Sequence, residues 1–419
     1  MYKDNMSIVR NLIISKNFES FDDLKHYFVN EYHLKVQEYK KLYMLRYTES
    51  SDLTDSIVRE CEGIIFEKNT NNIVHYTHKK CFDSIGTKED EVIVLDKYNK
   101  NNLIMDMYDI ENIKDDNDCK YLVQEYIDGS LIKVYNWNNE WIVSTASLIN
   151  AKNNFWKSNK SFYTLFEETV KNVYDQTFFE FTKTLDKKYA YSFVMQHPEN
   201  ETIISIKEPK LLIINRIDLS TINNKEQTII EEYSDDLKEI SIENINNLIG
   251  HAKNDNNLMD NYIITKIIDG VIDCKIKILS EKFLKMKTLY GNYPNIGLKY
   301  IEHISNVYNS KYEILSIQLD AIKAKKEFID TFSIKPITIE IDRLLQKTIN
   351  QILRLYIDTK IMKKDLVVPK KYEKTIKQLQ YNYSVKRNKL KKFYIEKSDV
   401  EDIIYSLPPK IIAFIICYE

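Results

Sequence analysis

Three glycines in this sequence follow an acidic residue and precede an apolar run, a pattern that could build a phosphate-handling site. They lie in Glu62-Gly63-Ile64-Ile65, Asp128-Gly129-Ser130-Leu131-Ile132 and Asp269-Gly270-Val271-Ile272. A fourth element is Lys285-Met286-Lys287, which we predict lies on a strand over residues 283–288. Lysines at i and i+2 of a strand point to one face and could clamp a phosphate there. Each acidic residue with its glycine is, taken singly, typical of a hairpin turn.

The glycine content excludes several nucleotide-binding loops. The chain of 419 residues has only 7 glycines, and no two of them lie within five positions of each other. A Walker loop, a dinucleotide fingerprint and a kinase glycine loop all need closer spacing. If the protein handles a nucleotide, side chains must therefore hold it.

Six segments, taken in order, resemble the phage-type RNA ligase 1 family. Tyr126-Ile127-Asp128-Gly129-Ser130-Leu131 is similar to the family's nucleophile motif, Lys-x-Asp-Gly-Ser-Leu. The other matching segments are residues 59–66, 78–83, 193–204, 269–271 and 285–287. The match spans residues 40–290, and the helical tail that follows fits the all-helical C-terminal domain of that family.

The resemblance implies a fold, a reaction and a set of partners. The fold would be α+β: a nucleotidyltransferase (ATP-grasp-like ligase) domain of antiparallel sheets with helices, then a helical domain. In that family a lysine attacks ATP to give lysyl-AMP, AMP moves to an RNA 5′-phosphate, and a 3′-hydroxyl displaces it. ATP and magnesium would be the cofactors of an active enzyme, and none need be bound by an inactive one. RNA, including tRNA, would be the partner.

The resemblance also implies roles for particular residues. The catalytic positions would be Tyr126 (in place of the nucleophilic lysine), Asp128, Gly129, Lys285 and Lys287. The nucleotide-binding positions would be Glu62, Lys80, Ser130, Gln196 and Asp269, and Asp269 would also hold the metal.

The departures from the family pattern fall where the chemistry is most demanding. Tyr126 replaces the lysine, and a phenol with a pKa near ~10 is a different nucleophile from a desolvated amine. Glu62 and Glu201 replace arginines, and a carboxylate at ~4–6 Å from a triphosphate costs on the order of a few kcal/mol. Gln196 stands near the place of the ribose-binding glutamate. This pattern predicts a protein that binds RNA and is catalytically inactive or impaired.

Two routes could still preserve activity. Lys133, three residues past Ser130, could reach the pocket from the following strand, or Tyr126 could itself accept AMP. Lys120 is excluded, because six residues of strand place it roughly 20 Å away.

The C-terminal segment is basic. Residues 291–419 carry a net charge of +8, and residues 360–397 contain 13 basic and 3 acidic residues. Tyrosines at 372, 381, 383 and 394 are interleaved with the lysines, and tyrosines can stack on unpaired bases. We expect nucleic-acid contacts from Lys370, Lys371, Lys374, Lys377, Lys391 and Lys392. The alternative is an amphipathic helix that packs on its tyrosines and leaves its lysines in water.

Hydrophobic periodicity divides the chain into an α+β domain over 1–290 and an all-helical domain over 291–419. We predict helices over 21–32, 157–185 and 230–253, an irregular segment over 90–120, and four helices after residue 292. We predict strands over 63–66, 73–76, 121–127, 131–137, 141–145, 189–196, 211–217, 262–268 and 271–278.

Cysteine usage and hydropathy set the expected compartment. The five cysteines are isolated and form no Cys-x-x-Cys pair, so we expect a reducing compartment, the cytoplasm. The sequence contains no run of 18 apolar residues, so we expect no membrane span. Three hypotheses remain: a degenerate ligase relative that binds RNA or a protein partner, an active RNA ligase with an unusual nucleophile, and a structural subunit of a larger, for example viral, assembly.

Overall fold

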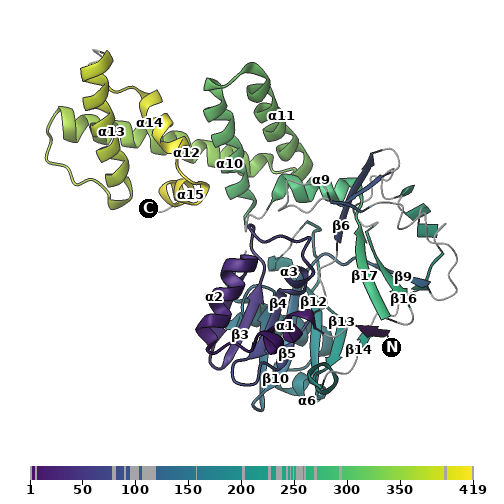
Figure 1. Ribbon diagram of the computed structural model, residues 1–419. Helices are drawn as coiled ribbons and strands as arrows, with labels where there is room; N and C mark the ends of the chain where they lie inside the picture. Colours follow the sequence, from purple (N-terminus) through teal and green to yellow (C-terminus); the bar gives the residue numbers. More distant parts are fainter. Residues whose placement is uncertain are drawn as a thin grey trace. The chain divides into compact units, whose positions relative to one another are not determined.

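The computed structural model divides into two compact units, Met1–Lys285 and Met286–Glu419 (Figure 1). It describes residues 2–4, 7–77, 82–88, 91–94, 103–105, 119–156, 158–200, 203–224, 228–232, 238–241, 244–245, 247–248, 250–251, 258, 261–268, 271–291, 295–390 and 394–417. Within these residues, no helix combines the length and the apolar character that a membrane crossing needs.

The first unit contains two sheets. The smaller one has the order β2-β3-β4-β5, from strands Lys35–Tyr39, Leu42–Arg46, Glu62–Glu67 and Ile73–His75. Within the described residues, the larger one has thirteen strands with the path β11-β10-β12-β13-β14-β1-β17-β16-β9-β15 and a branch through β6, β7 and β8. Its strands are β1 (Tyr2–Asp4), β6 (Phe82–Lys88), β7 (Glu91–Val94), β8 (Leu103–Met105), β9 (Cys119–Glu125), β10 (Ser130–Trp137), β11 (Glu140–Thr145), β12 (Tyr189–Gln196), β13 (Lys210–Asp218), β14 (Thr228–Glu232), β15 (Lys238–Glu239), β16 (Tyr262–Ile268) and β17 (Val271–Ile278).

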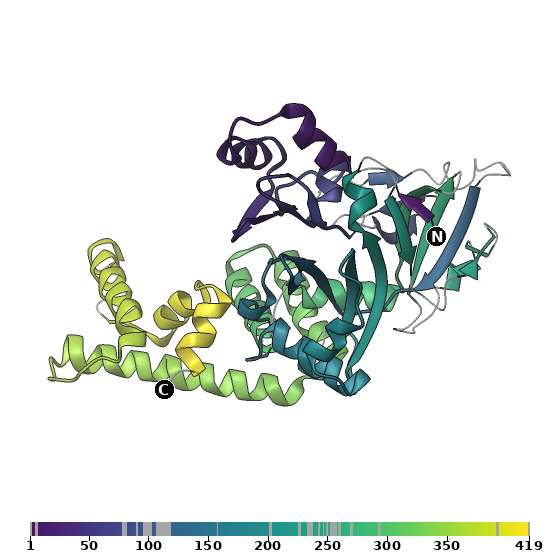
Figure 2. The ribbon, with the colours of Figure 1, turned by 90° about the horizontal axis from the view of Figure 1, so that it is seen from below.

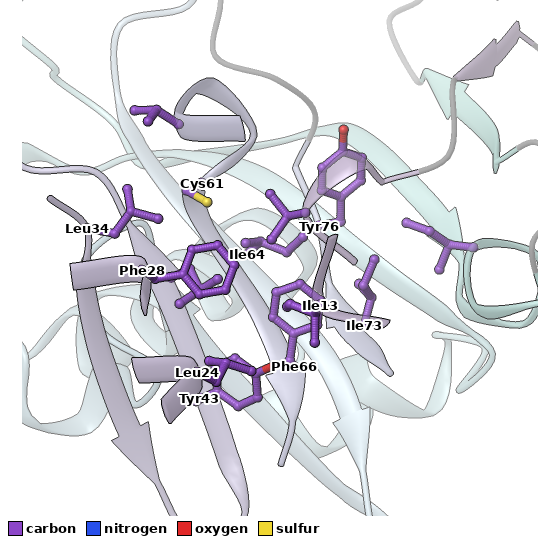
Figure 3. Packing of buried hydrophobic residues seen from close by; sticks show 14 of the residues in the cluster. Ile13, Leu24, Phe28, Leu34, Tyr43, Cys61, Ile64, Phe66, Ile73 and Tyr76 are labelled. Atoms are coloured by element: carbon purple, nitrogen blue, oxygen red, sulfur yellow. The ribbon is translucent and has the colours of Figure 1, made fainter. Parts of the chain in front are cut away.

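The smaller sheet is buried on both faces because apolar residues occupy successive positions of β3 and β4. Tyr43 and Phe66 face one core together with helices α1 (Ile8–Lys16) and α2 (Phe21–Tyr32), which Figure 3 shows. Met44 and Ile65 face the opposite core, which they share with Tyr135 and Ile142 of the large sheet. The other face of β10 and β12 packs on α5 (Phe162–Tyr174) and α6 (Phe178–Lys183).

Most predicted elements of this unit are confirmed. The strands over 189–196, 262–268 and 271–278 and the helix over 21–32 have the predicted bounds. The helix predicted over 230–253 is wrong at its start, because β14 and β15 lie there, and the irregular segment over 90–120 contains β7 and β8.

The strand predicted over 283–288 is also wrong, because these residues belong to helix α9 (Glu281–Tyr290). Ser280 begins the helix, and its Oγ accepts a hydrogen bond from the Phe283 N–H at 3.2 Å. Phe283, Met286 and Tyr290 are buried, and this i, i+3, i+7 spacing fits one face of a helix. The side-chain oxygen of Ser280 three residues before Phe283 was a start signal visible in the sequence.

The second unit is helical in all the elements that the structure describes. After the last turns of α9 come α10 (Ile296–Asn309), α11 (Leu315–Phe332), α12 (Lys335–Tyr356), α13 (Lys370–Leu390), α14 (Lys397–Tyr405) and α15 (Pro409–Cys417). The long helix α12 is seen along its length in Figure 2. Tyr300 and Phe328 are buried, as are Leu345 and Ile349 on α12 and Leu379 on α13, so each of these helices buries apolar side chains.

Candidate functional site

The Asp128-Gly129-Ser130 turn joins β9 to β10 and forms the centre of the candidate site. The Asp128 side chain is buried, and its Oδ2 accepts hydrogen bonds from the backbone N–H groups of Ile203 and Ile204 at 2.9 and 3.0 Å. Carboxylate-to-amide bonds of this kind are charge-assisted and strong. Asp128 therefore holds the segment after β12 against the turn.

Gly129 and Ser130 also have structural roles in the turn. A Cβ at Gly129 would lie 2.6 Å from Val194 Cγ1 and 2.8 Å from the Met195 carbonyl oxygen, so no larger residue fits. The amide of Asn200 donates to Ser130 Oγ at 2.6 Å, and the amide of Gln196 donates to the Asp128 carbonyl at 2.8 Å. The predicted site residues Asp128, Gly129, Ser130 and Gln196 thus lie together, each with a structural contact.

Tyr126 follows β9 and is fixed by contacts on several sides. Its backbone N–H donates to the Asn261 carbonyl at 2.8 Å, and its half-buried ring meets Phe283 edge-on with centroids 5.8 Å apart. Lys277 Nζ, from β17, lies 5.4 Å from the centre of the ring. The residue that the resemblance aligns with a nucleophilic lysine is therefore an aromatic group packed beside a lysine.

Lys285 and Lys287, which we predicted to share one face of a strand, do not share a face. Both lie on helix α9, where positions i and i+2 point about 200° apart. Lys275 and Lys277 lie on β17, where positions i and i+2 do share a face. The sequence contained this signal, because the strand over 271–278 was predicted correctly and includes Lys275-Ile276-Lys277.

Lys133 lies between the two sheets and is fully buried. Its Nζ donates to the backbone carbonyls of Glu62 at 2.8 Å and Gly63 at 2.7 Å. Burial lowers the pKa of Lys133 to about 7, and the Glu62 carboxylate opposes part of that shift. Burial holds the pKa of the enclosed His75 well below its usual value, and the positive charge of the Lys133 amine lowers that pKa further.

The bond from Lys133 depends on a bulge in β4. Register places Leu45 opposite Ile64 and Arg46 opposite Glu62, so Gly63 is the extra residue and has a φ of +77°. A bulge leaves one residue outside the ladder, and here its carbonyl bonds to the lysine. Lys133 is therefore a cross-link between sheets, with its amine engaged and enclosed, which disfavours it as a substitute nucleophile.

Several predicted residues cannot be located. Lys80, Glu201 and Asp269, and Lys391 and Lys392 in the tail, lie outside the described residues. Among the residues that are described, no three His, Cys, Asp or Glu side chains gather as a metal site would require. Glu62 is half-buried at the start of β4 beside the Lys133 bond.

Among the described side chains of helix α13, three lysines are exposed: Lys370, Lys374 and Lys377, which we call the lysine stripe. Their spacing, i, i+4 and i+7, puts them on one helix face, and Tyr381, which is 64% exposed, continues that face at i+11. Tyr372 instead is buried and donates its hydroxyl to Gln351 Oε1 at 3.1 Å. The tyrosines of this segment therefore divide between core and surface, and Lys371 lies half-buried over the Tyr372 ring.

Comparison with known proteins gives matches among solved structures alone. No family model matches the chain, and no curated protein matches it. An archaeal ATP-dependent RNA ligase matches in two forms, each with 9% identity over 80% of this chain and 82% of the other, with TM-scores of 0.37 and 0.34. A putative ATP-dependent DNA ligase from Aquifex aeolicus matches with 9% identity over 76% of this chain and 74% of the other, with a TM-score of 0.34. These structural neighbours are ATP-dependent ligases, and at such low values the similarity assigns neither a family nor an activity.

Proposed function

We propose that this chain is an RNA-binding relative of ATP-dependent RNA ligases that does not accept AMP on itself. The observation that carries the proposal is the group at position 126: a tyrosine whose ring packs against Phe283 and lies beside Lys277. A phenol is almost entirely protonated at neutral pH, because its ordinary pKa is near ~10. Covalent catalysis by an amine therefore has no counterpart at this position.

The retained motif residues support the same reading. Asp128, Gly129 and Ser130 each make a contact that holds the turn to β12 and the segment after it. A fold would keep these residues whether or not AMP transfer survived. Their presence is therefore no argument for activity, whereas the loss of the lysine argues against it.

RNA binding is supported by the charge of the second unit. The lysine stripe and Tyr381 present three amines and one exposed ring on a single face of α13. Amines neutralise phosphates and rings stack on unpaired bases, and both interactions tolerate any sequence. We assign RNA, rather than a membrane or an acidic protein, as the partner of this face.

We further propose that the first unit keeps a nucleotide-binding pocket in which the nucleophile is missing. Lys275 and Lys277 on β17 would face the phosphates of a bound ATP beside the Tyr126 ring. ATP, when bound, would supply the AMP group that the ligases transfer. The residues of this chain would bind and orient it without forming the covalent bond.

The test is incubation of the full chain with ATP labelled on the α-phosphate and magnesium, followed by a denaturing gel. Wild type should remain unlabelled, and Tyr126→Lys should become labelled if the pocket still holds ATP. Label on wild type would contradict the proposal and favour the second candidate, an active ligase with an unusual nucleophile. Tyr126→Phe, Lys133→Ala and Lys277→Met would then identify the group that carries it.

A further inference from the structure

Two adjacent aromatic side chains are exposed on a loop of the first unit. Phe155 and Trp156 follow a short 3-10 turn, Ala151–Asn153, and are 55% and 44% exposed. Large aromatic residues are usually well buried, and when they are exposed together they indicate an interaction surface. We call Phe155 and Trp156 the aromatic pair.

The backbone immediately before the aromatic pair is anchored. The Asn154 side chain is buried and donates to Thr145 Oγ1 at 2.8 Å and to Ser147 Oγ at 3.3 Å. The Asn154 carbonyl accepts a hydrogen bond from the Phe162 N–H at 2.8 Å. The chain is thus fixed by the core of the unit at the residue that precedes the exposed rings.

Two neighbouring residues, Glu199 and Asn200, connect this loop to the Asp-Gly-Ser turn through their hydrogen bonds. Ser158 Oγ donates to Glu199 Oε2 at 2.6 Å, and Lys160 Nζ bonds to Glu199 Oε1 at 2.6 Å. The next residue, Asn200, donates to Ser130 Oγ at 2.6 Å. The aromatic pair therefore lies two residues from a contact network that ends at the candidate site.

We propose that the aromatic pair stacks on unpaired bases of a bound RNA. The inference rests on the proposed function and adds a base-stacking surface to it. Flat rings bind base faces, which are accessible in single strands and hidden in a duplex. Lys152, exposed on the 3-10 turn just before the pair, supplies a positive charge for the backbone of that strand.

The test compares two RNA ligands and four proteins. Affinities of wild type, Phe155→Ala, Trp156→Ala and Trp156→Tyr are measured by fluorescence anisotropy with a labelled single-stranded oligonucleotide and with a blunt duplex of the same length. Loss of one base-stacking ring should weaken single-strand binding by roughly 5- to 140-fold. Duplex affinity should be unchanged, and Trp156→Tyr should keep most single-strand affinity because it keeps a ring.

Phe179→Ala is the matched control, since Phe179 on α6 is also an exposed aromatic at 68%. It should leave both affinities unchanged. If Trp156→Ala and Phe155→Ala both bind single-stranded RNA as tightly as wild type does, the inference is overturned while RNA binding itself stands. An aromatic pair that docks a protein would give this result. No binding of either RNA by wild type would overturn the inference together with the proposed RNA-binding function.

Discussion

Replacing Lys133 with methionine should remove a rise in stability with pH that the buried amine gives to the first unit. Lys133 is fully enclosed, and burial lowers the pKa of its amine to about 7, against 10.5 for an ordinary lysine. Between these two pH values the unfolded chain holds a proton that the folded chain has released. Stability therefore rises with pH across this window.

The magnitude follows from the size of the shift. Each pH unit within the window is worth about 1.4 kcal/mol at most for one group, so the whole window is worth about 5 kcal/mol. The contribution of Lys133 is complete above the unfolded pKa and is lost as pH falls through about 7. Wild type should gain about 2–3 kcal/mol in free energy of unfolding between pH 7 and pH 9, relative to Lys133→Met.

Urea unfolding at several pH values measures this difference. Tryptophan fluorescence is a suitable signal, because Trp137, Trp141 and Trp156 all belong to the first unit. Lys152→Met, at an exposed lysine, is the matched control and should follow wild type across the pH range. Parallel curves for wild type and Lys133→Met would refute the reasoning, since they would mean that the two carbonyl bonds keep the buried amine charged.

Three further predictions concern the turn, the bulge and the tail. Gly63→Ala should lower the free energy of unfolding by about 1–3 kcal/mol, because φ is +77° and the new Cβ would lie 2.7 Å from the Ala146 carbonyl oxygen. The control is Gly250→Ala, whose new Cβ would meet nothing within 4 Å, and it should lower the free energy of unfolding far less in the same urea titration. Asp128→Asn should lower it by about 1.5–3 kcal/mol, since charge-assisted bonds to two backbone N–H groups become neutral or are lost; an unchanged midpoint would contradict this role. Alanine at all three positions of the lysine stripe should reduce the slope of log affinity for RNA against log salt concentration by up to about 3. Binding titrations at several salt concentrations measure this slope. An unaltered slope would mean that the lysine stripe does not contact RNA.

Periodicity and turn residues were enough to predict most of the first unit. Strands β12, β16 and β17 alternate or concentrate apolar residues between polar segments, so their bounds could be predicted. The prediction for the segment of α9 failed because Leu284-Lys285-Met286-Lys287 alternates apolar and polar residues, and a pattern of this length fits a strand and a helix equally well. The capping serine, together with the spacing of Phe283, Met286 and Tyr290, distinguishes the two.

The turn at the candidate site could be predicted from the sequence, but the residues that pack around the turn could not. Asp128, Gly129 and Ser130 are contiguous, so their proximity follows from the sequence alone. The cross-link from Lys133 to Gly63 joins residues 70 positions apart through a bulge, which no local pattern encodes. The contact of Lys277 with Tyr126 depends on which strands meet beside the turn, and this is a property of sheet topology.

The most direct test of the central claim is the transfer of label from α-labelled ATP to the full chain in the presence of magnesium. We predict no covalent label on wild type, because the side chain at position 126 is a packed phenol and the Lys133 amine is bonded between the sheets. Acid-stable or alkali-stable label on wild type that disappears in Tyr126→Phe or Lys133→Ala would contradict it.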